Sequence, residues 1–275
     1  MVIRRLLGVV AAVTPWNSPM ITPAWKWLPA LVAGNAVVLK PSELSTAIAL
    51  ATVELWREAG LPAGVLELVP GGAETGRMLC AEPSVDAIHF TGSTDTGRAV
   101  AGFAAARSAR CVVELGGLYS AIVFDDADLE HAADCIVSAA IAVNGQKCTP
   151  ARARRTRCRG GVAVGADDAN RGAPARRVPL ADPLRRRDLF APVLTVESFD
   201  RDDGAWEIAN ETPYGLAAAV YTSSVERAGA AQERLEVGVV GINRRCDSAE
   251  LEAPIEVQKL RATAFRKDAN TPTAV

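Results

Sequence analysis

Residues 87–106 have the sequence AIHFTGSTDTGRAVAGFAAA, and they decide the fold class. Ala87–Phe90 has the length and apolar character of a buried strand, and Thr94–Ala106 reads as an alanine-rich amphipathic helix. The polar turn between them offers Ser93 or Thr94 as the N-cap of that helix. A strand that leads directly into a helix of this length indicates a crossover between parallel strands.

The same strand-and-helix unit recurs on both sides of this stretch. Apolar runs of strand length occupy residues 8–13, 36–39, 65–69, 87–90, 111–113 and 121–124. Helical segments separate the first five runs, at residues 23–32, 45–59, 76–81 and 94–106. The first of these helices is almost entirely apolar, so we expect it to be buried. The alternation predicts an α/β fold with a doubly wound parallel sheet, which binds ligands at the carboxyl ends of its strands.

The second half of the chain continues this pattern less regularly. A helix is expected at residues 128–143, capped by Asp125 and Asp126. Residues 151–187 contain eleven arginines without a clear period, so no element is expected there. The elements expected after that segment are a strand at 192–199, a helix at 202–210, a strand at 216–222, a helix at 225–235 and a strand at 237–243.

The composition excludes several classes of protein. Hydrophobic residues make up 49% and charged residues 23%, which is typical of a globular chain rather than a disordered one. The net charge of -2 gives no global attraction to nucleic acid or membrane phosphates, and no apolar run is long enough to cross a bilayer. The six cysteines lack CxxC spacing and the two histidines lie far apart, so we expect no metal site and no disulfides. Cysteines that stay as free thiols favour a cytoplasmic location.

Polar residues follow four of the runs, at the points where the predicted strands end. Asn17, Lys40, Ser93 and Glu114 each lie at or just after such an end. A lysine or a helix N-terminus there suits an anion, and a carboxylate there can act as a general base. Each residue alone also fits an ordinary cap or an exposed turn. The predicted topology brings all four to one edge of the sheet, which favours a ligand site.

Cys148 ends the polar stretch Asn144–Cys148, just past a predicted helix. A thiol there can be a nucleophile if a base, a cation or a helix dipole stabilises its thiolate form. The alternative is a small apolar side chain, which we favour for Cys80, Cys111 and Cys135 because each lies within an apolar pattern. Position alone leaves both alternatives open for Cys148.

Eight short motifs together resemble the aldehyde dehydrogenase superfamily, in its order and at about its spacings. These motifs are Thr14–Asn17, Lys40–Glu43, Phe90–Gly97, Glu114–Gly117, Gly145–Cys148, Phe190–Val193, Asn210–Leu216 and Gly241–Asn243. The resemblance is continuous over residues 6–149 and resumes over 188–243. It implies a partial dinucleotide-binding domain at 1–114, a partial catalytic domain at 115–243 that is anomalous over 150–187, and a tail at 244–275.

The resemblance also implies an activity, the oxidation of a small-molecule aldehyde to a carboxylic acid with NAD or NADP. Cys148 would attack the aldehyde to give a thiohemiacetal, and Asn17 and the Cys148 N–H would hold the oxyanion. Glu114 would activate the water that hydrolyses the later thioester. Glu43 favours NAD because its charge disfavours a 2′-phosphate. The implied cofactor-binding residues are Trp16, Lys40, Ser42, Glu43, Gly92, Ser93, Gly97, Asp188 and Phe190.

Several positions depart from the family's pattern. Asp188 stands where a glutamate is usual, and Leu118 stands where a lysine is usual. The family's opening portion, much of the chain after Cys148 and a glycine-rich segment after Asn243 have no counterpart, so its homo-oligomer contacts are expected to be incomplete. We therefore expect an aldehyde dehydrogenase that is truncated and impaired in activity. The alternatives are a non-catalytic nucleotide-binding remnant and a pseudogene product.

Overall fold

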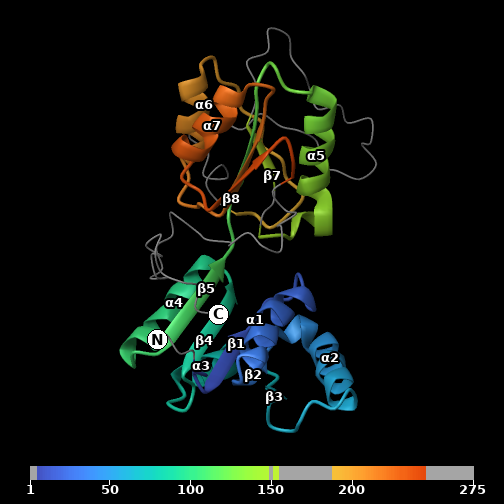
Figure 1. Cartoon of the computed structure of the whole chain (residues 1–275), viewed down its shortest axis with the longest axis vertical. Coiled ribbons are helices and arrows are strands. Elements are labelled where there is room, and N and C mark those ends of the chain that lie inside the picture. Colours follow the sequence, from blue (N-terminus) through green and yellow to red (C-terminus); the bar gives the residue numbers. More distant parts are fainter. Residues whose placement is uncertain (1–4, 149–150, 155–187, 246–275) are drawn as a thin grey trace. The chain divides into compact units, whose positions relative to one another are not determined.

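The structure is a computed structural model and describes residues 5–148, 151–154 and 188–245 (Figure 1). Its described residues fall into two compact units, with the division between Leu115 and Gly116. Each unit has its own parallel sheet, which confirms the α/β fold class. Most of the arginine-rich segment and nearly all of the C-terminal tail lie outside the described residues.

The first unit holds a five-stranded sheet in which all strands are parallel. Its strands are β1 (Val9–Val13), β2 (Ala36–Lys40), β3 (Leu66–Leu68), β4 (Ala87–Gly92) and β5 (Arg110–Leu115), in the order β3-β2-β1-β4-β5. The strand order reverses between β1 and β4, and such a switch point is where open α/β sheets bind ligands. The first five predicted strands are confirmed, but the sixth run belongs to the second sheet.

Helices cover both faces of this first sheet. The helices α1 (Ile21–Val32) and α2 (Thr46–Glu58) pack on the face that carries Val10 and Ala12, and the 3-10 turn η1 (Glu43–Ser45) precedes α2. The helices α3 (Ala73–Ala81) and α4 (Thr94–Ala106) lie on the other face (Figure 1). Gly97 lets α4 approach the side chains of Phe90 and Leu115 closely, because a Cβ at this position would overlap Leu115.

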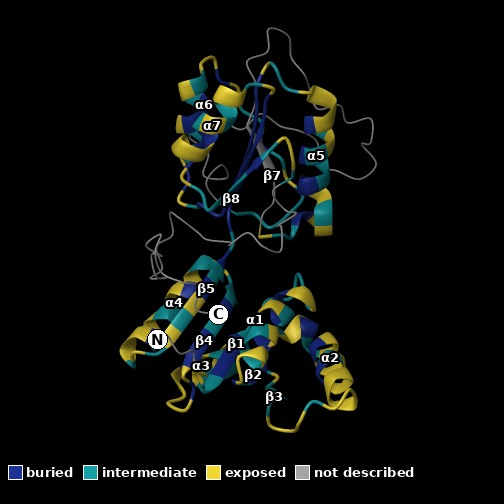
Figure 2. Cartoon of the chain, viewed as in Figure 1, coloured by how far each residue is buried: buried dark blue, intermediate teal, exposed yellow. Residues whose placement is uncertain are grey.

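The prediction that the first helix is buried throughout is wrong. α1 buries Lys26 and Trp27, whereas Ile21, Trp25 and Val32 are 57%, 55% and 88% exposed. Only one side of a helix can face a sheet, so an apolar helix needs a further partner to be buried all round. Figure 2 shows the exposed residues of α1 as yellow stretches along the helix.

The second unit holds a four-stranded parallel sheet. Its strands are β6 (Tyr119–Val123), β7 (Ala151–Arg154), β8 (Ala217–Tyr221) and β9 (Val239–Ile242), in the order β7-β6-β8-β9. β7 corrects the expectation of no element at 151–187, because alternating alanine and arginine has the period of a strand. No full strand forms at 192–199: Ser198 makes a single β-bridge, Leu194 and Val196 pack against the core outside the four-stranded sheet, and Pro192 has no N–H to donate.

Helices cover both faces of the second sheet as well. α5 (Leu129–Ile141) packs on one face, and α6 (Asp202–Asn210) and α7 (Val225–Arg234) pack on the other (Figure 1). Residues of β6 alternate between these two cores: Tyr119 and Ala121 face α5, whereas Ile122 faces α6 and α7. Buried strands of this kind carry apolar residues on both faces, which is why β6 and β8 read as continuous apolar runs.

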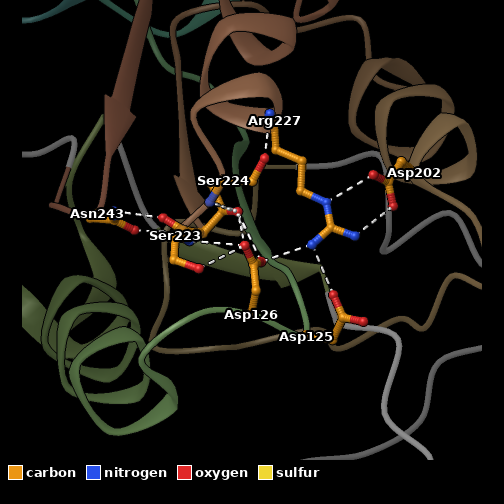
Figure 3. A network of polar contacts seen from close by, with 8 residues as sticks. Asp125, Asp126, Asp202, Ser223, Ser224, Arg227 and Asn243 are labelled. Carbon is orange, nitrogen blue, oxygen red and sulfur yellow. Dashed lines mark hydrogen bonds and ion pairs between the residues drawn. The ribbon is translucent and has the colours of Figure 1, made fainter.

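A charged network ties together the loops of the second unit (Figure 3). The guanidinium of Arg227 donates to Asp125, Asp126 and Asp202 at distances between 2.8 and 3.2 Å. The prediction that Asp125 and Asp126 cap the following helix is therefore wrong, and Asp128 caps α5 instead. The two carboxylates serve tertiary contacts because Arg227 lies within their reach.

Candidate active site

Lys40 and Glu114 both lie at the carboxyl edge of the first sheet, one residue apart in register. β1 and β2 pair Val13 with Lys40, the last residue of each strand, and β4 and β5 pair Thr91 with Glu114. Parallel strands end at the same edge of a sheet, so the lysine and the carboxylate both lie at the edge where such folds bind ligands.

The turn after β1 carries two more of the predicted site residues. The N–H of Thr14 donates to the carbonyl oxygen of Lys40 at 3.1 Å, so this turn leaves the sheet at the same edge. Trp16 and Asn17 follow in the turn, and both are half-buried. Asn17 therefore belongs with Lys40 to the edge of the first sheet.

Ser93 opens α4 and is its N-cap, one of the two caps that the sequence allowed. Its Oγ accepts a hydrogen bond from the N–H of Thr96 at 3.3 Å and lies 2.9 Å from Thr96 Oγ1. Ser93 is exposed, whereas Gly97 in the first turn is buried. Gly92 leaves room for the Phe90 ring, which would lie 2.5 Å from a Cβ there. The start of α4 thus offers free backbone N–H groups to an anion.

Lys40 and Glu43 both lie close to α3. The Glu43 carboxylate lies 3.1 Å from the position that a Cβ on Gly72, the N-cap of α3, would occupy, so it meets the positive end of that helix dipole. Lys40 is 8% exposed, and burial lowers its pKa while the charges of Glu43 and Cys80 act in the opposite direction. Ser42 caps η1 between the two charged residues.

A buried lysine that the sequence analysis missed lies within electrostatic range of Glu114. Lys26 of α1 is 3% exposed, and burial lowers its pKa to about 8 while the Glu114 carboxylate acts in the opposite direction. Burial and then the charge of Lys26 lower the pKa of His89 to about 3, so its imidazole is neutral near pH 7. The sequence did carry one signal for this site, because Lys26 is a lone charged residue within an otherwise apolar helix.

Cys148 lies in the second unit, just after the 3-10 turn η2 (Ala142–Gly145), and is exposed. Its carbonyl oxygen lies 3.6 Å from the position that a Cβ on Gly117 would occupy, and the Cβ of Leu216 lies 3.1 Å from that same position. Three motifs that are far apart in the sequence, those of Gly117, Cys148 and Leu216, therefore meet in this unit.

Asp188 and Phe190 join the same region of the second unit. Oδ1 of Asp188 accepts a hydrogen bond from the N–H of Phe190 at 3.1 Å, and Oδ2 lies 2.8 Å from the position of a Cβ on Gly116. Phe190 has a φ of +48°, which is uncommon for a residue other than glycine. Close packing against Gly116 therefore holds this segment beside the glycine pair of the second unit.

The four described thiols differ in exposure. Cys148 is exposed, Cys80 is buried, and Cys111 and Cys135 are half-buried. Burial raises the pKa of Cys80 and raises that of Cys111 to about 11, which suits the structural role expected for both. Cys158, like the last cysteine of the chain, lies outside the described residues.

Two other kinds of site are absent from the part of the chain that the structure describes. No group of three or more potential metal ligands occurs among these residues. None of their helices combines the length and the apolar content needed to cross a bilayer.

Comparison with known proteins agrees with the motifs. Residues 1–154 and 175–256 match the model of the aldehyde dehydrogenase family. The aldehyde dehydrogenase KauB from Pseudomonas aeruginosa is 32% identical, with a TM-score of 0.82 over 92% of this chain and 63% of that one. An NAD-dependent aldehyde dehydrogenase from Sinorhizobium meliloti is 29% identical (TM-score 0.82; 93% and 62%). An NADP-dependent enzyme from E. coli is 31% identical (TM-score 0.83; 93% and 65%).

The chain spans less than two thirds of the length of each of these structures. The family match nevertheless covers both units and continues on the far side of a break over residues 155–174. The resemblance inferred from the motifs is thereby confirmed. The chain belongs to the aldehyde dehydrogenase family.

Proposed function

We propose that this chain carries the chemistry of a nicotinamide-dependent aldehyde dehydrogenase, which oxidises a small-molecule aldehyde to a carboxylic acid. The observation that carries the proposal is the edge of the first sheet, where Lys40 and Glu114 lie at strand ends and Asn17 and Ser93 follow strand ends. Membership of the family supplies the reaction class.

Cys148 is the proposed nucleophile. Its exposed thiolate attacks the aldehyde carbon, so a C–S bond forms and the carbonyl oxygen becomes an oxyanion. The side-chain amide of Asn17 and the N–H of Cys148 donate hydrogen bonds to this oxyanion. When bound, the nicotinamide supplies a hydride acceptor, and loss of hydride from the thiohemiacetal leaves a thioester on Cys148.

Glu114 is the proposed general base for the second half of the reaction. Its carboxylate takes a proton from a water molecule as the water oxygen attacks the thioester carbon, and the C–S bond breaks to release the carboxylic acid and regenerate the Cys148 thiolate. The charges of Lys26 and this carboxylate act on each other, and the Lys26 pKa of about 8 leaves the lysine largely protonated near pH 7. Lys26 therefore places a cation within electrostatic range of the proposed base.

The first unit has features that fit a dinucleotide. The start of α4, capped by Ser93, offers N–H groups to the pyrophosphate, and Gly92 and Gly97 let this helix start pack closely on Phe90 and Leu115. Lys40 and Glu43 offer a cation and a carboxylate to the adenosine ribose. The remaining proposed contacts are Trp16 and Ser42 in the first unit, and Asp188 and Phe190 on the nicotinamide side.

We favour NAD over NADP. A 2′-phosphate near the Glu43 carboxylate would place two negative charges close together, which costs free energy at any dielectric. The similar structures include both an NAD-dependent and an NADP-dependent enzyme, so the choice rests on Glu43.

The test follows NADH or NADPH absorbance with a panel of aliphatic and aromatic aldehydes. We expect reduced cofactor with the native chain, none with Cys148→Ala, and a native rate with Cys135→Ala, which alters a half-buried thiol. A native rate in Cys148→Ala would overturn the assignment of the nucleophile. Calorimetric binding of NAD by a native chain that forms no reduced cofactor would instead support the non-catalytic nucleotide-binding alternative.

A further inference from the structure

Two segments with left-handed backbone occur in the second unit. Val143, Asn144 and Gly145 have φ values of +53°, +55° and +72°, and Phe190 has +48°. The N–H of Gln146 donates to the carbonyl oxygen of Val143 at 2.9 Å and closes the first segment. A β-branched valine is a poor choice for this conformation, so the surrounding structure imposes it rather than local preference.

Gly145 is the point at which these two segments touch. It is buried, and a Cβ added to it would overlap the carbonyl group of Ala191 and the nitrogen of Pro192. These are backbone atoms, so they cannot rotate away as a flexible side chain can. The position requires glycine both for its left-handed φ and for the space.

The segment that contains Ala191 is held by its own hydrogen bonds. The N–H of Phe190 donates to Oδ1 of Asp188 at 3.1 Å, and the N–H of Val193 donates to the carbonyl oxygen of Ala191 at 2.7 Å. Because the segment is braced in this way, a shift at Ala191 moves its neighbours as well. A displacement of Gly145 would therefore shift the backbone of both segments.

We propose that Gly145 is a positioning residue. Its backbone contact with Ala191 fixes the loop 146–148, which ends at Cys148, against the segment 188–193. The inference rests on the proposed role of Cys148 as the nucleophile. Cys148 follows Gly145 by a short loop and is exposed, so its own burial does little to hold it in place. A reacting group displaced by about 1 Å can lose ~10² in rate, which is why such a loop needs a fixed anchor.

The test uses two substitutions at the contact and two matched controls. Gly145→Ala and Gly145→Asn separate the contact from backbone preference, because asparagine tolerates a left-handed φ but still carries a Cβ. Gly229→Ala introduces a Cβ with nothing within 4 Å. Gly8→Ala introduces comparable strain in the first unit, where φ is +126° and a Cβ would overlap the Asp86 carboxylate.

Both readouts use the full chain without cofactor or aldehyde. We expect amide hydrogen exchange in peptides covering residues 188–193 to rise by about tenfold in both Gly145 variants. We expect the rate at which iodoacetamide alkylates Cys148 to rise by about threefold or more. The two controls should leave both rates at the native values.

Native exchange at residues 188–193 in either Gly145 variant would overturn the proposal, as would a native or slower alkylation rate. An equal effect of Gly8→Ala would also overturn it, because general strain would then explain the result. Neither readout requires turnover. A chain that fails to oxidise aldehydes would therefore count against the proposed function while leaving the test of Gly145 decisive.

Discussion

Arg227 and Asp126 lie 101 residues apart in the chain, yet Nη1 of Arg227 lies 2.8 Å from Oδ1 of Asp126. The same guanidinium binds Asp202 and lies 4.4 Å from the centroid of the Phe124 ring. The Arg227 side chain is only 20% exposed. One residue of α7 therefore joins the loop after β6 to the start of α6.

Arg227→Ala is expected to lower the free energy of unfolding by about 2–3 kcal/mol, because it leaves partly buried carboxylates without their cation. Urea denaturation followed by circular dichroism measures this change. Arg98→Ala is the matched control, since Arg98 pairs at 3.4 Å with Asp95 on the surface and is 64% exposed. Its loss should cost less than about 0.5 kcal/mol. Equal urea midpoints for the two variants would contradict the structural role of Arg227.

Asp126 is expected to make stability depend on acid pH. Burial raises the pKa of Asp126, but hydrogen bonds from Thr222, Ser223 and Arg227 outweigh it and lower the pKa from 3.8 to about 2. A carboxyl group whose pKa is lower in the folded state stabilises the fold at pH values above its unfolded pKa. This contribution is lost as the pH falls through the folded pKa. The stability difference between the native chain and Asp126→Asn should be constant near neutrality and shrink between about pH 4 and pH 2. A difference that stays constant over that range would show that Asp126 does not ionise differently on folding.

Lys26→Met is expected to stabilise the chain near pH 7. The pKa of Lys26 falls from 10.5 to about 8 on folding, so below pH 8 the folded state bears the full cost of a buried charge. Between these values the unfolded chain binds more protons, and native stability rises with pH. The advantage of methionine should be about 2 kcal/mol near pH 7 and should shrink towards pH 10. Arg77→Met, at a side chain that is 61% exposed, should show no such dependence.

The regular elements were predictable where their signals are local. α4 spans Thr94–Ala106, the predicted range, because its apolar period and its Ser93 cap are both written in neighbouring residues. β7 was missed because the arginines at alternate positions of Ala151–Arg154 hid a pattern with the period of a strand. The run at 192–199 has a strand-like composition, but joining a sheet depends on the partners available to it.

In the candidate site, the positions set by strand topology could be predicted, whereas those set by tertiary packing could not. Lys40 and Glu114 could be assigned to one edge because parallel topology alone places strand ends together. The burial of Lys26 could not be predicted, since it depends on how α1 packs on the sheet. The close approach of Gly145 to Ala191 could not be predicted either, because no local pattern records which distant segments touch.

Cys148 is expected to be the first of the four described thiols to react with iodoacetamide. It is exposed, whereas burial raises the pKa of both Cys80 and Cys111 and so reduces their thiolate fraction. Brief labelling followed by peptide mapping gives the order of reaction, with the unfolded chain in urea as the reference in which the thiols should react alike. Preferential labelling of Cys135 in the folded chain would mean that the exposed position of Cys148 is wrongly assigned.

Aldehyde oxidation by this chain is expected to be slow, below ~1 s⁻¹, which is the low end of typical enzymes. Cys148 is exposed to water, and an attacking group that water surrounds must shed its hydration shell and hold its orientation before it reacts. NADH formation with saturating NAD and a panel of aldehydes measures the rate, and Cys148→Ala supplies the background. Turnover above ~1 s⁻¹ that is abolished in Cys148→Ala would refute this expectation, because it would mean that exposure of the thiol to water does not limit the reaction.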